Sequence, residues 1–159
     1  DKSAFSRMDA ACAMAMLAVN QCEEYRIVCT AGDDNKREGS HEWIQYPAKG
    51  FDLFNQIKGV KERIGWGGIF TRQVLEWSRD IFAGEKFDRI IIFSDSQDCD
   101  LPGKGKPNPF GIRNYICDVS SHTHGINYKG IWTAEISGFS ENFLTLLGAK
   151  GGLSNEFEN

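Results

Sequence analysis

The residues from Arg89 to Phe93 constrain the fold more than any other part of the sequence. They form a short, continuous apolar run rich in β-branched side chains, and Ser94 and Asp95 follow at once. A run without polar alternation is typical of a parallel strand that is covered on both faces. It therefore predicts a buried strand in an open α/β sheet. Asp95 is then expected at the carboxyl end of that strand, where such sheets bind ligands.

Two strong helical patterns accompany this strand. The ten residues from Ala10 to Val19 are all apolar. They predict a helix that begins at Ser6, is buried all round and packs against the middle of the sheet. A second helix is expected from an N-cap at Thr71 to a stop at Gly84. Its expected buried face consists of Val74, Leu75, Ser78, Ile81 and Phe82.

The remaining segments alternate in the same way. Further strands are predicted at residues 25–31, 42–46, 114–119 and 131–136, and further helices at residues 51–60 and from residue 140. Alternating helices and strands predict an α/β fold, here a doubly wound, Rossmann-like, mostly parallel sheet with helices on both faces. One domain is expected over residues 1–150, followed by a tail at 151–159.

Composition narrows the partners and the compartment. The chain has a net charge of −4, so any contact with nucleic acid must come from a local basic patch or from another part of the molecule. No apolar run is long enough to span a bilayer and no signal peptide is visible, which predicts no membrane partner. The odd number of cysteines, with no C-x-x-C pair, predicts reduced thiols in a cytoplasmic protein. The cysteines are Cys12, Cys22, Cys29, Cys99 and Cys117.

Carboxylates cluster after the apolar strand. Asp95, Asp98 and Asp100 lie within six residues and suit a hard cation such as Mg²⁺. The alternative for Asp98 and Asp100 is a pair of solvated loop acids. Residues 65–68, Gly-Trp-Gly-Gly, either bring backbone amides near an anion or form a flexible loop before the helix. Thr71 offers a hydroxyl beside this loop.

A long loop rich in proline, glycine and lysine spans residues 97–111. Lys104 and Lys106 in this loop, with Arg113, form the best local candidate for contact with phosphate groups. The alternative is a solvated loop surface without a ligand.

The histidines offer a weaker candidate for chemistry. His122 and His124 stand in a Ser-Ser-His-Thr-His segment with no nucleophile elbow before it. An ordinary polar loop is the favoured interpretation over a metal-dependent hydrolase that would use Asp95 with one of these histidines. Asp118 begins a partial D-x-S-x-S match, but His122 stands where the second serine is needed, so this motif is not assigned. We expect no enzymatic activity.

Several segments in order resemble one family. The sequence resembles the von Willebrand factor A-type domain of the TROVE, or Ro autoantigen, RNA-binding proteins in four segments. They are residues 6–11 before a small-residue helix, residues 66–68 before the second helix, residues 91–97 and residues 128–141. The similarity covers roughly Ser6 to Gly148, and the closing Gly-Phe-Ser segment is its most specific part.

The resemblance implies a von Willebrand factor A fold with a metal-ion-dependent adhesion site for Mg²⁺ or another divalent cation. Asp95 matches the third metal loop. Ile69 stands where the second loop normally has its threonine, and Thr71 follows two residues later as the other implied ligand. The first loop, D-x-S-x-S, and its central strand do not occur in this sequence. We expect a preceding segment, a separate chain or a covalent partner to supply that strand.

For function, the resemblance implies a non-catalytic domain of a ribonucleoprotein. Such proteins bind small structured or defective non-coding RNA, mainly through a helical-repeat ring that this chain does not contain. The alternative is a metal-dependent protein-binding module that holds an acidic side chain of its partner and binds no RNA.

Overall fold

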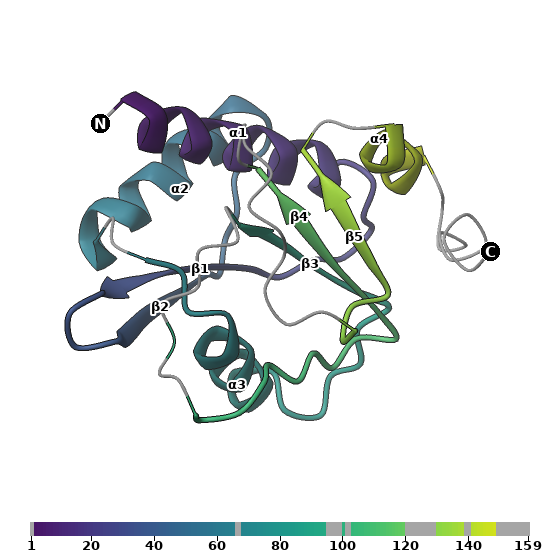
Figure 1. Cartoon of the computed structure of the whole chain (residues 1–159). Helices are drawn as coiled ribbons and strands as arrows, with labels where there is room; N and C mark the ends of the chain where they lie inside the picture. The colour runs from purple at the N-terminus through teal and green to yellow at the C-terminus, as the bar shows by residue number, and fades with distance from the viewer. Residues whose placement is uncertain are drawn as a thin grey trace. The chain divides into compact units, whose positions relative to one another are not determined.

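The structure of the chain is a computed structural model (Figure 1). The structure describes residues 2–65, 68–94, 100, 103–119, 130–138 and 141–148. The chain divides into two compact units. The first unit comprises Asp1–Glu23, Lys86–Ser96 and Pro109–Asn159, and the second comprises Glu24–Glu85 and Gln97–Asn108.

The first unit contains a parallel sheet. Its strands are β3 (Arg89–Ser94), β4 (Arg113–Asp118) and β5 (Ala134–Ser137), in the order β3-β4-β5 with both pairs parallel. The prediction of a strand over the apolar run is confirmed, and with it the α/β class. The fifth strand begins later than predicted, because the three residues before it bend towards β4 and the N–H of Thr133 donates to the carbonyl oxygen of Asn114.

Two helices, α1 (Lys2–Val19) and α4 (Glu141–Gly148), complete this unit. α1 contacts β3 and α4 contacts β5, and the rings of Phe93 and Phe143 meet edge to face at 6.4 Å. These contacts bury a cluster of side chains that fixes the carboxyl end of the sheet. The cluster consists of Met14, Tyr115, Cys117, Ile136, Phe143 and Leu146.

The prediction for the first helix is wrong in two respects. The helix begins at Lys2 and not at Ser6, since no glycine or proline interrupts the residues before Ser6. It is also not buried all round. Met14 is fully buried, but Leu17 is 40% exposed. A helix that covers one face of a sheet buries one stripe, whatever the composition of its other side.

The second unit begins with a β-hairpin. β1 (Ile27–Asp33) pairs antiparallel with β2 (Glu38–Ile44). These strands reach closer to the turn than the predicted strands at residues 25–31 and 42–46. The side chain of Asp33 makes this possible, because it accepts hydrogen bonds from the N–H groups of Asn35 and Lys36 at 2.9 and 3.2 Å and so closes a tight turn.

The helices of the second unit are α2 (Phe51–Ile64) and α3 (Thr71–Ile81). α2 contacts both strands of the hairpin and α3 contacts β2. The predicted buried face of α3 is correct except for Ile81, which is 46% exposed while Phe82 is buried. Gly84, with φ of +88°, follows the helix as predicted.

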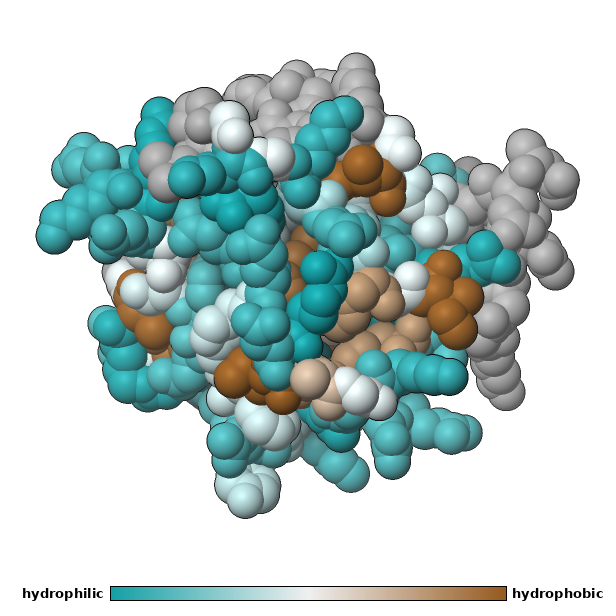
Figure 2. All heavy atoms as spheres, turned by 90° about the horizontal axis from the view of Figure 1, so that it is seen from below, coloured by the Kyte–Doolittle hydropathy of each residue, from teal (hydrophilic) through white to brown (hydrophobic). Residues whose placement is uncertain are grey.

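The described cysteines, Cys12, Cys22, Cys29 and Cys117, are in the thiol form, and Cys99 lies outside the described residues. Burial raises the pKa of the Cys117 thiol to about 12. Within the described part of the chain, no helix has the length and apolar character needed to cross a bilayer. The face shown in Figure 2 is mainly hydrophilic, with hydrophobic residues in small groups.

Candidate functional site

Polar residues end all three strands of the parallel sheet. Ser94 of β3 pairs in register with Asp118 of β4, which pairs with Ser137 of β5. The N–H of Val119 donates to the carbonyl oxygen of Ser94 at 2.8 Å, and the N–H of Gly138 donates to that of Asp118 at 2.6 Å. Ser94 and Asp118 are buried. The carboxyl edge of the sheet is therefore an ordered row of oxygen-bearing side chains.

Asp95 follows Ser94 directly in the sequence. Asp95 itself lies outside the described residues, as do Asp98, His122 and His124, so their roles remain predictions. Asp118 was set aside in the sequence because its motif is incomplete. Its position at the end of a predicted strand was the signal that could have placed it at this edge.

The described residues provide only part of a cation site. The Ser94 hydroxyl and the Asp118 carboxylate have the oxygen chemistry that Mg²⁺ and Ca²⁺ prefer. Within the described ranges, no three histidine, cysteine, aspartate or glutamate side chains gather as a metal-binding group. Thr71, the other predicted ligand, is a buried residue of the second unit, so its role as a ligand also remains a prediction.

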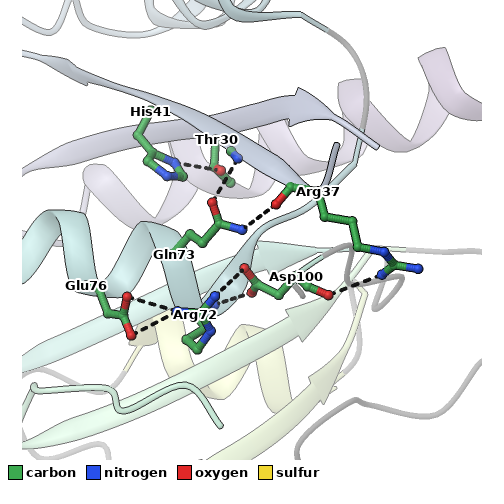
Figure 3. Close-up of polar contacts among 8 residues, drawn as sticks. Thr30, Arg37, His41, Arg72, Gln73, Glu76 and Asp100 are labelled. Carbon is green, nitrogen blue, oxygen red and sulfur yellow. Dashed lines mark hydrogen bonds and ion pairs between the residues drawn. The ribbon is translucent and has the colours of Figure 1, made fainter. Parts of the chain in front are cut away.

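The start of α3 differs from the prediction. Its N-cap residue is Phe70 and not Thr71, because the fully buried Phe70 provides the carbonyl that accepts the first helical hydrogen bond, from the N–H of Val74 at 2.8 Å. The carboxylate of Asp100 takes over the capping function and accepts a hydrogen bond from the N–H of Arg72 at 2.6 Å (Figure 3). A carboxylate at a helix N-terminus is favoured by the exposed N–H groups and the helix dipole.

Asp100 lies three residues before a lysine-bearing segment, residues 103–108, which we call the basic loop. The side chain of Asp100 is 1% exposed and lies 3.8 Å from the guanidinium of Arg72. The carbonyl oxygen of Asp100 accepts a hydrogen bond from Arg37 at 3.2 Å. At the other end, Arg79 donates to the carbonyl oxygen of Asn108. Side chains of the second unit therefore hold the chain at Asn108, the last residue of the basic loop, and at Asp100, three residues before the loop begins.

Between these anchors the basic loop is open. Lys104 and Lys106 are exposed. Gly103 and Gly105 alternate with them at φ of +83° and +98°, and nothing lies within 4 Å of where a Cβ atom would be. The two ammonium groups and the adjacent backbone are thus accessible to an anion. Arg113, predicted to act with these lysines, belongs to the first unit, so its part in the patch remains a prediction.

A polar network supports the anchors. The side chain of Gln73 accepts a hydrogen bond from the N–H of Gly39 at 2.8 Å and donates to the carbonyl oxygen of Arg37 at 3.1 Å (Figure 3). His41 and the Thr30 hydroxyl share a hydrogen bond of 2.9 Å. Burial lowers the pKa of His41, against a smaller, opposing effect of the Asp100 charge. No sequence pattern indicated this network, which ties the hairpin to α3.

In comparisons with known proteins, no family model, curated protein or solved structure matches the chain. The resemblance to the A-type domain of TROVE proteins therefore remains a prediction. Conclusions about function have to come from the geometry of the described residues.

Proposed function

We propose that the chain is a non-catalytic RNA-binding domain of the TROVE A type that contacts RNA phosphates through its basic loop. The observation that carries this proposal is the fixation of the chain at Asp100 and Asn108, with Lys104 and Lys106 exposed between these two residues. Phosphate contacts account for most of the affinity of proteins for RNA and do not require a basic chain overall.

The anchoring matters for affinity. A loop that is already ordered loses less conformational entropy when it binds than a mobile one. The glycines beside each lysine let a phosphate oxygen approach the backbone amides, because no side chain fills that space. The acidic balance of the chain confines this attraction to local basic patches such as the basic loop.

A divalent cation is the second part of the proposal. Asp95 would bind Mg²⁺ or a related cation, with most of its shell completed by water. The row formed by Ser94 and Asp118 at the carboxyl edge supports this assignment. The same row favours the second candidate function, a protein-binding module that holds a partner's carboxylate through the cation.

The finer fold assignment is also proposed. Among the described residues β3 pairs with β4 alone, and the apolar residues Ile90 to Phe93 are only half-buried. Edge strands of this composition are normally covered. A further strand from a preceding segment or another chain would cover β3 and complete a von Willebrand factor A sheet. A cooperative unfolding transition of monomeric residues 1–159 would count against this requirement.

The RNA proposal is tested by a Lys104→Ala/Lys106→Ala double variant. The affinity for a small structured RNA is measured over a series of salt concentrations, and the log–log slope should become shallower by about 1.5 to 2. A Lys36→Ala/Lys86→Ala variant removes the same charge from two other exposed positions and should leave the slope unchanged. Equal slopes for the wild type and the basic-loop variant would refute the proposal.

The cation is tested separately by titrating Mg²⁺ into wild type and an Asp95→Ala variant in a calorimeter. We expect heat of binding in the wild type alone. If chelation of the cation abolishes binding to an acidic peptide while the protein binds no RNA, the protein-binding alternative replaces the proposal.

A further inference from the structure

Aromatic side chains are exposed around the start of α2. Phe51 is 73% exposed and Tyr46, just before the helix, is 86% exposed. The rings of Phe51 and Phe54 lie 5.5 Å apart with 35° between their planes, and the ammonium of Lys58 lies 4.5 Å from the centre of the Phe54 ring. Phe51, Phe54 and Lys58 share one side of the helix at i, i+3 and i+7, which we call the aromatic face of α2.

The segment that carries Tyr46 is fixed to the same helix. The side chain of Gln56 accepts a hydrogen bond from the N–H of Ala48 at 2.8 Å and donates to the carbonyl oxygen of Tyr46 at 3.0 Å. The side chain of Tyr46 is therefore displayed from an anchored backbone. An ordered, exposed ring needs little reorganisation before a planar ligand stacks on it.

Charge distinguishes this region from the rest of the chain. Residues 46–58 contain two lysines, Lys49 and Lys58, and one acid, Asp52, whereas the whole chain has a net charge of −4. Rings beside lysines suit a ligand with planar apolar faces and a negatively charged backbone. Single-stranded nucleic acid has this chemistry at every residue.

The exposed area argues for the same ligand. A stable protein–protein interface buries about 800 Å² on each partner, and two or three rings, at about 150–250 Å² each, provide less. One ring is enough to stack one base. We propose that Phe51 and Tyr46 stack unpaired bases of a single-stranded RNA segment, with Lys49 and Lys58 near its phosphates. This inference rests on the proposed function, since it takes RNA as the partner.

The experiment compares Phe51→Ala and Tyr46→Ala with the wild type by fluorescence anisotropy. The probes are a labelled uridine-rich RNA of about 12 nucleotides, within the usual site size for such proteins, and a blunt RNA duplex of the same length. Loss of a stacked base should weaken single-strand binding by about 5- to 100-fold. Affinity for the duplex and the salt slope should stay unchanged, because no charge is removed.

Two control variants separate stacking from general effects. Phe51→Trp keeps an aromatic ring and should retain single-strand affinity. Leu144→Ala removes an apolar side chain of comparable exposure, 59%, from the first unit and should have no effect. Because the substituted residues are exposed, the thermal midpoint should be the same in all variants.

The outcomes distinguish failure of base stacking from failure of the proposed RNA binding through the basic loop. If Phe51→Ala and Tyr46→Ala bind the single strand like the wild type while the basic-loop variant still loses salt dependence, stacking is refuted and the proposed function stands. If the wild type binds neither RNA, both are refuted. Equal losses on single strand and duplex, or binding to phosphatidylserine vesicles that depends on Phe51 without any RNA binding, would also overturn stacking.

Discussion

Both units of the molecule have an apolar core, but within each unit a different kind of contact fixes the candidate site. In the first, side chains from α1, the parallel sheet and α4 form one apolar cluster that includes Met14, Ile136 and Phe143. In the second, hydrogen bonds of Gln73 and Asp100 connect the hairpin, α3 and the basic loop. Apolar burial is non-directional and tolerates small shifts, whereas hydrogen bonds hold particular atoms at particular places.

This difference corresponds to the proposed division of roles. The apolar cluster of the first unit positions a row of strand ends, and the polar network of the second positions an exposed loop. A loop that lies mostly on the surface buries few side chains, here Pro107 among residues 103–108, so hydrogen bonds contribute much of its order. Polar side chains of the second unit therefore position the segment that we propose to bind RNA.

The largest effect is expected from removing Phe143, which is fully buried against Phe93. Phe143→Ala should lower the free energy of unfolding by about 3–5 kcal/mol, as measured by urea denaturation. The adjacent Leu144 is 59% exposed, so Leu144→Ala should cost less than about 0.5 kcal/mol. Similar costs for the two variants would show that α4 does not pack as described.

Substitution of Asp100 is the corresponding test of the free energy of unfolding in the second unit. Asp100→Ala removes a buried carboxylate from the N–H and guanidinium of Arg72 and should cost about 3 kcal/mol. Asp100→Asn keeps an acceptor for the N–H and should cost less. Asp34→Ala, at an exposed turn position, is the control. Faster hydrogen exchange confined to the N-terminus of α3 would locate the effect.

The apolar contacts were the part of the fold that the sequence could predict. Arg89 to Phe93 form a strand because a continuous β-branched run has few other stable environments. Gly84 marks the end of α3 because glycine adopts positive φ without strain. Both signals are local, so one segment is enough to interpret them.

The rest depends on partners that lie far away in the sequence. Asp100 caps a helix that begins 29 residues earlier, and Gln73 bonds to a hairpin more than 30 residues away. Asp33 set the length of β1 and β2 through its turn. Leu17 looked like a core residue because composition does not reveal how many sides of a helix will be covered. Such features follow from tertiary contacts and not from spacing or propensity.

A smaller, pH-dependent effect is expected at His41. Burial lowers the pKa of His41 below its ordinary value of 6.5, so the unfolded chain binds more protons than the folded one just below pH 6.5. The free energy of unfolding should therefore fall as the pH drops through 6.5 and level off below the folded pKa. In His41→Gln, which can still bond to Thr30, this part of the dependence should disappear. Parallel pH profiles for the two proteins would contradict the assignment.

The smallest effect concerns the second partner of Arg72. Its guanidinium also donates to both carboxylate oxygens of Glu76, at 3.1 and 3.0 Å, but Glu76 is 57% exposed whereas Asp100 is 1% exposed. Because water screens the exposed pair, Glu76→Ala should cost only about 0.3–0.5 kcal/mol. This cost should shrink further at high salt.

Arg72 thus contacts one exposed and one buried carboxylate, so the strengths of the two contacts can be compared within the same network. The coupling of each pair is measured by a double-mutant cycle with Arg72→Ala. We expect the coupling to Asp100 to be several times the coupling to Glu76. If the two are equal, burial does not decide the strength of these contacts. The order of the basic loop would then have to come from its other anchor, between Arg79 and Asn108.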